Sequence, residues 1–186
     1  TAIIGGGASL SGGNLSVAAL EITSSTLTVT SLKVGSIVSN GFVTISAFVN
    51  VGSVEARSGE LILKGGGTSN GSFYAAGDLL AGDIAFESGT FTLTNAQFTG
   101  PGVSYVDGET AALSVMGTVS VYGDLTLAYG TIVGGGSAGA GLLSVPGTFE
   151  MWGGSLSADA SVAGSFVWGG GVLGGNRTTT VSGFLD

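Results

Sequence analysis

The stretch "GSFVWGGGVLGGN", residues 164–176, combines six glycines with Phe166, Trp168 and Leu173. Glycine weakens helices and strands, but it turns the chain sharply at little steric cost. Apolar residues two positions apart on a strand face the same side. The pattern Gly-x-apolar-x-apolar-x-x-small-x-apolar recurs three times upstream and once more weakly, starting at Gly147, Gly123, Gly89 and Gly59. It predicts two short strands, each with inward-facing apolar residues, joined by a tight corner.

Repeated strand-corner-strand units that cannot bury their apolar side alone are typical of solenoids. We therefore predict an all-β parallel β-solenoid (β-helix) of roughly 8–10 short coils. The copies are expected to stack in phase, so that each core position lies over the same position of the preceding coil. The predicted core consists of Phe91, Leu93, Phe98, Leu125, Leu127, Ile132, Phe149, Met151, Leu156, Phe166, Trp168 and Leu173.

A β-sandwich or jelly roll is the alternative fold, because short alternating strands with frequent turns also suit it. It does not explain the in-phase repeats. We expect one β domain over residues 1–186, with a less regular part at 1–57 and glycine-punctuated repeats over 59–186. The last repeat is followed by "GFLD" from Gly183, so the chain is expected to end inside a repeat, and its start at Thr1 suggests a processed chain or an excised piece.

Charged residues are scarce, with 12 acidic and 4 basic side chains and a net charge of −8. The basic residues lie far apart, which argues against a nucleic-acid interface, since binding phosphate requires clustered cations. The absence of cysteine and histidine excludes thiol and imidazole chemistry. No apolar run approaches the roughly 20 residues of a membrane span.

The C-terminal third resembles a known repeat. "GSFVWGGGVLGGNRTTTVSG" (164–183) and, less closely, "GTFEMWGGSLS" (147–157) are similar to the G-x-F-x-W-x-G-G-x-L repeats of large secreted surface proteins of bacteria and some algae. The resemblance covers residues 89–186 at most. Such proteins are similar to filamentous-haemagglutinin and autotransporter-like adhesins. The resemblance implies an extracellular stalk, filament or adhesin and carries over no catalytic residue and no cofactor.

Carboxylates are the only ionisable groups in number. A polysaccharide-active enzyme or phage-tail depolymerase on this fold would need acidic side chains clustered with a base. The candidates are Asp78, Asp83, Glu87, Asp107, Glu109 and Asp124, with Lys64 as the nearest base. No spacing pairs them as general acid and base, so we favour solvated turn carboxylates and predict no enzyme activity, no cofactor and no metal site.

Other polar and aromatic positions suggest weaker alternatives. Thr28/Thr30, Thr90/Thr92 and Thr178/Thr180 would suit an ice-binding ladder only if they recurred once per coil, which they do not. Trp152 falls at an outward position of its repeat, as an assembly contact or a carbohydrate platform would. Glycosylation sequons occur at Asn14, Asn70 and Asn176, and would matter if the source is eukaryotic.

We therefore expect a non-enzymatic, extracellular structural protein: a subunit or segment of a self-assembling surface filament, stalk or adhesin. Residues 1–20 carry no charge, and neither do residues 178–185. Uncharged strand edges favour pairing with another chain. The expected partner is a second copy, bound head to tail through Ala2, Ile3, Ile4, Phe184 and Leu185, with a surface polysaccharide as a further candidate. The alternative function is a carbohydrate- or ice-binding module.

Overall fold

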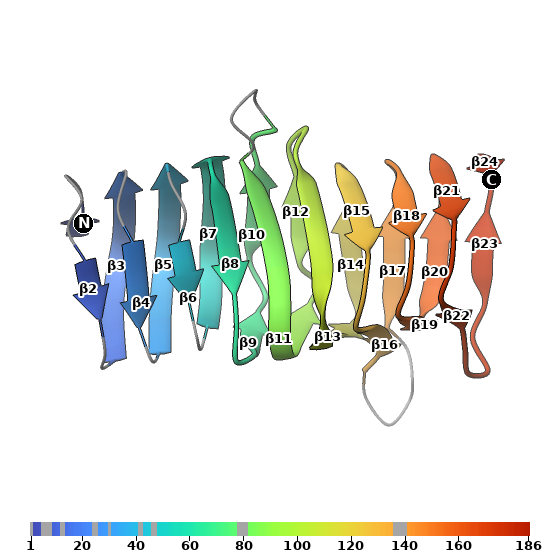
Figure 1. Cartoon of the computed structure of the whole chain (residues 1–186), viewed down its shortest axis with the longest axis horizontal. Coiled ribbons are helices and arrows are strands. Elements are labelled where there is room, and N and C mark those ends of the chain that lie inside the picture. Colours follow the sequence, from blue (N-terminus) through green and yellow to red (C-terminus); the bar gives the residue numbers. More distant parts are fainter. Residues whose placement is uncertain are drawn as a thin grey trace.

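The computed structural model describes residues 2–4, 9–11, 14–23, 26–29, 31–40, 43–45, 48–77, 82–135 and 141–186. Before residue 48, side chains are described only for Leu20, Thr44 and Ile45. The described residues form strands joined by short corners, without a helix. Figure 1 shows them wound into an elongated stack of coils, with the N-terminus at one end and the C-terminus at the other.

Three parallel stacks of strands, here named faces A, B and C, form the sides of the coil. Face A contains β1 (Ala2–Ile4), the second parts of β3 (Asn14–Thr23), β5 (Ser31–Asn40) and β7 (Phe48–Ser58), then β10 (Ser72–Ala75), β12 (Gln97–Thr99), β14 (Thr118–Val121), β17 (Leu142–Val145), β20 (Asp159–Val162) and β23 (Thr179–Val181). Face B contains β2 (Ser9–Ser11), β4 (Thr26–Val29), β6 (Val43–Ile45), β8 (Glu60–Leu63), the first parts of β11 (Asp83–Thr94) and β13 (Val103–Met116), then β15 (Asp124–Leu127), β18 (Phe149–Met151), β21 (Ser165–Trp168) and β24 (Phe184–Leu185). Face C contains the first parts of β3, β5 and β7, then β9 (Gly67–Ser69), the second parts of β11 and β13, β16 (Thr131–Gly134), β19 (Ser155–Ser157) and β22 (Val172–Leu173).

Every described strand pairing is parallel and joins one coil to the next, so the chain is a parallel β-solenoid. A sandwich or jelly roll would pair its strands antiparallel, and that alternative is wrong. The solenoid has about six turns. The pairings of faces A and B continue back to β1 and β2. The pairings of face B also continue without a break from β6 to β8, which lie on either side of the boundary between residues 1–57 and 59–186.

Apolar side chains from all three faces fill the interior. Ten of the twelve predicted core residues are buried, and six phenylalanines are among the largest fully buried side chains. Two pairs on successive coils stack face to face: Phe73 on Phe98, with ring centroids 4.5 Å apart, and Phe149 on Phe166, at 5.1 Å. Burying an aromatic ring stabilises the fold, and offset stacking adds to the gain.

The corner between faces B and C explains the glycines of the repeat. Its small position stacks from coil to coil, and its glycines have positive φ: Gly66, Gly89, Gly130, Gly154 and Gly171. Gly154 shows both requirements for glycine. Its φ of 67° is rarely adopted by residues with a Cβ, and an added Cβ would lie 2.4 Å from the carbonyl oxygen of Gly130. The small position therefore sets both the turn and the close approach of successive coils.

One repeat is out of the predicted phase. Phe149 and Phe166 lie over Leu125 on face B, as predicted. Phe91, however, pairs with Leu113 on face C, so the copy from Gly89 begins one face later than the others. Inward and outward positions alternate identically on every face, and the ten-residue pattern therefore fits the corner from C to A as well as the corner from B to C. In this copy the residue with positive φ is Asn95, at 52°, one position before the small residue Ala96, whereas in the copies from Gly123, Gly147 and Gly164 it is the small glycine itself.

Trp168 and Leu173 contradict the core prediction. Trp168 is 47% exposed and Leu173 38% exposed. Both have the inward phase, over Met151 and Leu156 respectively. Among the described strands, none pairs with the outer edge of β22, and β24 pairs with β21 only at Ser165 and Phe166. These side chains lack the next coil that would cover them.

Candidate functional site

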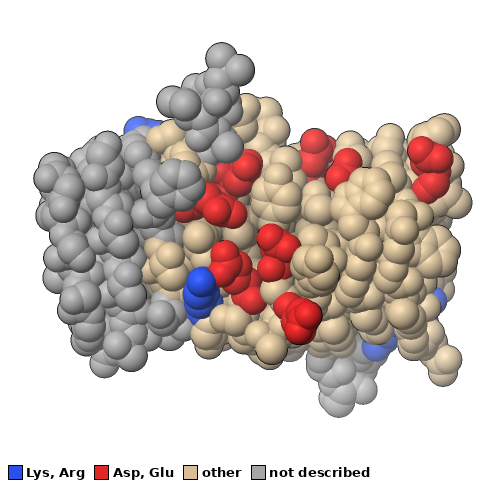
Figure 2. Space-filling view, viewed as in Figure 1, with Lys and Arg blue, Asp and Glu red and all other residues tan. Residues whose placement is uncertain are grey.

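The acidic candidates gather on face B because successive coils bring distant residues into register. Glu60 lies beside Asp83, and Figure 2 shows acidic side chains over the middle of this face, next to a basic group. Lys64 forms an ion pair with Glu87, with 2.7 Å between Nζ and Oε2. Burial, then the negative charges of Glu87, Asp83 and Asp107, raise the pKa of Glu60 above its ordinary value.

Several aspartates on the coil connect one turn to the next. Asp83 accepts a hydrogen bond from the backbone N–H of Val103, at 3.0 Å, and Asp124 accepts one from Thr148, at 3.1 Å. Asp159 does the same for Thr178, at 2.9 Å. Each carboxylate satisfies a backbone donor at the start of the same face in the next coil. Sequence reasoning missed this role, although the Gly-Asp pairs at 82–83 and 123–124 were its visible signal.

The remaining acidic candidates do not form one cluster. Asp107 and Glu109 are exposed on β13, and Asp78 lies outside the described residues. The part of the chain that the structure describes contains no group of three His, Cys, Asp or Glu side chains placed to hold a metal ion. The main interaction among Glu60 and its acidic neighbours Asp83, Glu87 and Asp107 is therefore electrostatic repulsion between their carboxylates.

That repulsion gives a pH-dependent prediction for Glu60→Gln. A raised pKa in the folded state means that the fold favours the protonated carboxyl. The corresponding stability is present below the ordinary value of 4.5 and is lost as pH rises through the folded pKa. Glutamine does not titrate, so the variant should be more stable than the parent at neutral pH, with the advantage shrinking as pH falls through the folded pKa and absent below the ordinary value of 4.5. Urea unfolding across pH measures this, and Glu109→Gln, at an exposed position, is the control. An equal pH dependence in the parent and Glu60→Gln would contradict it.

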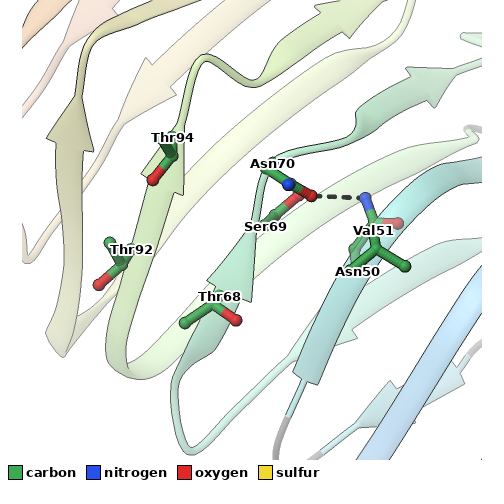
Figure 3. A pocket seen from close by; sticks show the side chains of 7 residues that line it. All are labelled: Asn50, Val51, Thr68, Ser69, Asn70, Thr92 and Thr94. Carbon is green, nitrogen blue, oxygen red and sulfur yellow. Dashed lines mark hydrogen bonds between the residues drawn. The ribbon is translucent and has the colours of Figure 1, made fainter.

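A shallow groove of about 280 Å³ crosses face C (Figure 3). Beside it, the buried Asn50 donates from Nδ2 to Ser69 Oγ, at 3.1 Å, and accepts from the N–H of Gly52 at 3.0 Å. Thr92 lies in register with Thr68 on the neighbouring strand. The groove is lined by Asn50, Val51, Thr68, Ser69, Asn70, Thr92 and Thr94. Asn50 also donates to the carbonyl oxygen of Ser72, and Ser69 Oγ accepts from the N–H of Gly71, so these two side chains bond to each other and to the corner backbone.

The predicted threonine pairs do not form one surface. Thr28 belongs to β4 on face B, Thr90 and Thr92 to β11 on face C, and Thr180 to β23 on face A. An ice-binding ladder needs a flat array on one face, so these pairs give no support to it. Thr30 lies outside the described residues.

The last coil exposes most of the large apolar side chains near the C-terminus. Phe184 and Leu185 of the predicted assembly contact are 63% and 60% exposed, and Val172 is 59% exposed. At the other end, β1 pairs only with β3, and β2 only with β4, among the described strands. The side chains of Ala2, Ile3 and Ile4 are not among those described. Within the described part of the chain, the strands at both ends therefore have one unpaired edge.

The remaining predicted positions are distributed over the coil. Trp152 is exposed at the end of β18, and its indole N–H donates to Glu150 Oε2 at 3.1 Å. Asn70 and Asn176 are exposed, whereas the side chain of Asn14 is outside the described set. The described residues include no helix long and apolar enough to cross a membrane.

Comparisons with protein-family models, curated proteins and solved structures find no match to this chain. The class of protein is therefore defined by its architecture, a parallel β-solenoid.

Proposed function

We propose that this chain is a non-enzymatic structural segment of an extracellular filament, stalk or adhesin, and that it assembles head to tail with further copies of itself. The observation that carries the proposal is the exposed apolar surface of the last coil. The resemblance of the repeats to those of secreted surface proteins supports the same function.

The strands of the last coil are paired on one edge only in the described part of the chain. Among the described strands, β22, β23 and β24 each pair with the preceding coil only. Natural edge strands usually carry lysine, proline or a covering segment that prevents further pairing. These three strands contain neither lysine nor proline. Their backbone and the exposed side chains of Val172, Phe184 and Leu185 can gain both hydrogen bonds and apolar burial from one more coil.

The parallel arrangement favours one mode of contact. Strands of one face all run in the same direction, so a second copy continues the sheets only if its first coil meets the last coil of its neighbour. Such a contact is heterologous and propagates into a fibre unless it closes into a ring. The first 20 residues carry no charge that would oppose it.

Adding charge to the open end should prevent this assembly. We expect the parent to form fibres visible by negative-stain electron microscopy. Val172→Lys combined with Phe184→Lys should be monomeric by analytical ultracentrifugation, because pairing would bury two ammonium groups. Deleting residues 1–7 should likewise leave a folded chain that does not polymerise.

The control is Tyr122→Lys, since Tyr122 is comparably exposed but lies in the middle of the coil stack. It should assemble like the parent. A parent that stays monomeric at high concentration, or fibres that persist in the double lysine variant, would overturn the proposal.

A further inference from the structure

Two exposed aromatic side chains lie on one edge of the solenoid, where face B meets face C. Tyr129 is 55% exposed and Trp152 54%. They lie on successive coils, because they follow the paired strands β15 and β18. We call these two residues the aromatic row. Trp168 on the next coil is not part of it, because its position over Met151 gives it the inward phase.

The strand register offsets the two rings. Leu127 and Met151 lie side by side on β15 and β18. Tyr129 is two residues beyond this line, and Trp152 is one residue beyond it. With about 4.8 Å between neighbouring strands, the two side chains are close enough to contact one ligand. Among the described residues neither ring stacks on another aromatic ring, so each presents its own surface.

Trp152 is held in place before any ligand binds. Its indole N–H is engaged by Glu150 at 3.1 Å. Its six-membered ring lies against Gly169 of the next coil, since a Cβ on that glycine would be 2.3 Å from Cε3. Any other residue at 169 would displace the ring. A side chain that is ordered yet half exposed loses little conformational entropy on binding.

We propose that the aromatic row binds a neutral polysaccharide. The face of an aromatic ring is negative, and it attracts the slightly positive C–H groups on the face of a sugar ring. Glu150 accepts the indole N–H through Oε2, and its carboxylate has further acceptor positions that a sugar hydroxyl can use. A chain of sugar rings can contact the two aromatic rings on successive coils at once.

Charge selects the class of polysaccharide. The chain has a net charge of −8. Glu150 is on the same strand as the row, and Asp107 and Glu109 are exposed on the face B strand β13, which pairs with β15. The ion pair of Lys64 with Glu87 is several coils away. Uronate-bearing chains would meet repulsion here, whereas neutral chains would not.

The experiment is affinity electrophoresis of the full chain in gels containing hydroxyethyl cellulose, soluble xylan or polygalacturonate. We expect at least one neutral polymer to retard the parent and polygalacturonate to have no effect. Trp152→Ala and Tyr129→Ala should each weaken retardation about tenfold, and Trp152→Phe should restore part of it. Tyr122→Ala removes an equally exposed ring outside the row and should bind like the parent.

Thermal unfolding of each variant separates binding from folding, and Tyr129→Ala remains informative if Trp152→Ala unfolds. The inference is independent of assembly, so the Val172→Lys and Phe184→Lys double variant should retain binding. Absence of retardation by both neutral polymers, retardation by polygalacturonate alone, or undiminished binding in both alanine variants would overturn it. If the aromatic row instead binds a second copy of this chain, Trp152→Ala should no longer form fibres. Loss of fibres in Trp152→Ala, together with no retardation of the parent by either neutral polymer, would also overturn the proposal.

Discussion

Phe149→Ala should lower the free energy of unfolding by about 3–5 kcal/mol. The Phe149 ring is fully buried and lies between Leu125 and Phe166 of the neighbouring coils. It stacks on Phe166 with ring planes 12° apart. The spacing of coils is fixed by backbone hydrogen bonds on three faces, so the structure cannot collapse into the cavity that alanine leaves. Urea unfolding followed by circular dichroism measures the loss.

Phe184→Ala is the matched control for this experiment. It removes the same side chain from an exposed position on the last coil, and should change the stability of the monomer by less than about 0.5 kcal/mol. Both variants are compared at low protein concentration, where assembly does not contribute. Equal effects at the two positions would show that Phe149 is not part of a continuous core.

Much of the fold could be predicted because its determinants are local. Alternation of apolar residues specifies which side chains of a strand face inward, and glycine at the small position specifies a corner. The pairing of Phe149 with Phe166 followed from these two signals alone. The displacement of Phe91 to face C could not be predicted, because the local pattern is the same on all three faces. Only the number of residues per coil decides the face, and that number varies along this chain.

The candidate sites depend on contacts between coils and were therefore less visible in the sequence. Glu60 and Asp83 are far apart in the chain, and only the register of β8 with β11 makes them neighbours. The aromatic row likewise depends on the spacing of two strands. The exposure of Trp168 was missed because its local pattern is that of a core residue, whereas no described strand lies over it.

The closest approach between coils should be the least tolerant of substitution. Gly108 lies in β13 where this strand turns from face B to face C, and an added Cβ would be 1.6 Å from the carbonyl oxygen of Glu87. That oxygen belongs to the backbone of β11 and cannot rotate away as a side chain could. Gly108→Ala must therefore separate β11 from β13, which form the longest paired strands of the solenoid. We expect a loss of at least about 3 kcal/mol in the free energy of unfolding.

Gly134→Ala provides the matched control, because a Cβ at this position in β16 would meet its nearest atoms at 3.5 Å, an ordinary contact. Replacing glycine there restricts the unfolded chain and should leave stability unchanged or raise it by up to about 1 kcal/mol. Chemical denaturation of both variants gives the comparison, and hydrogen exchange should show the loss of protection in Gly108→Ala centred on β11 and β13. If Gly108→Ala were as stable as Gly134→Ala, the coils could not be in such close contact at this corner, and the register of β11 with β13 would have to change.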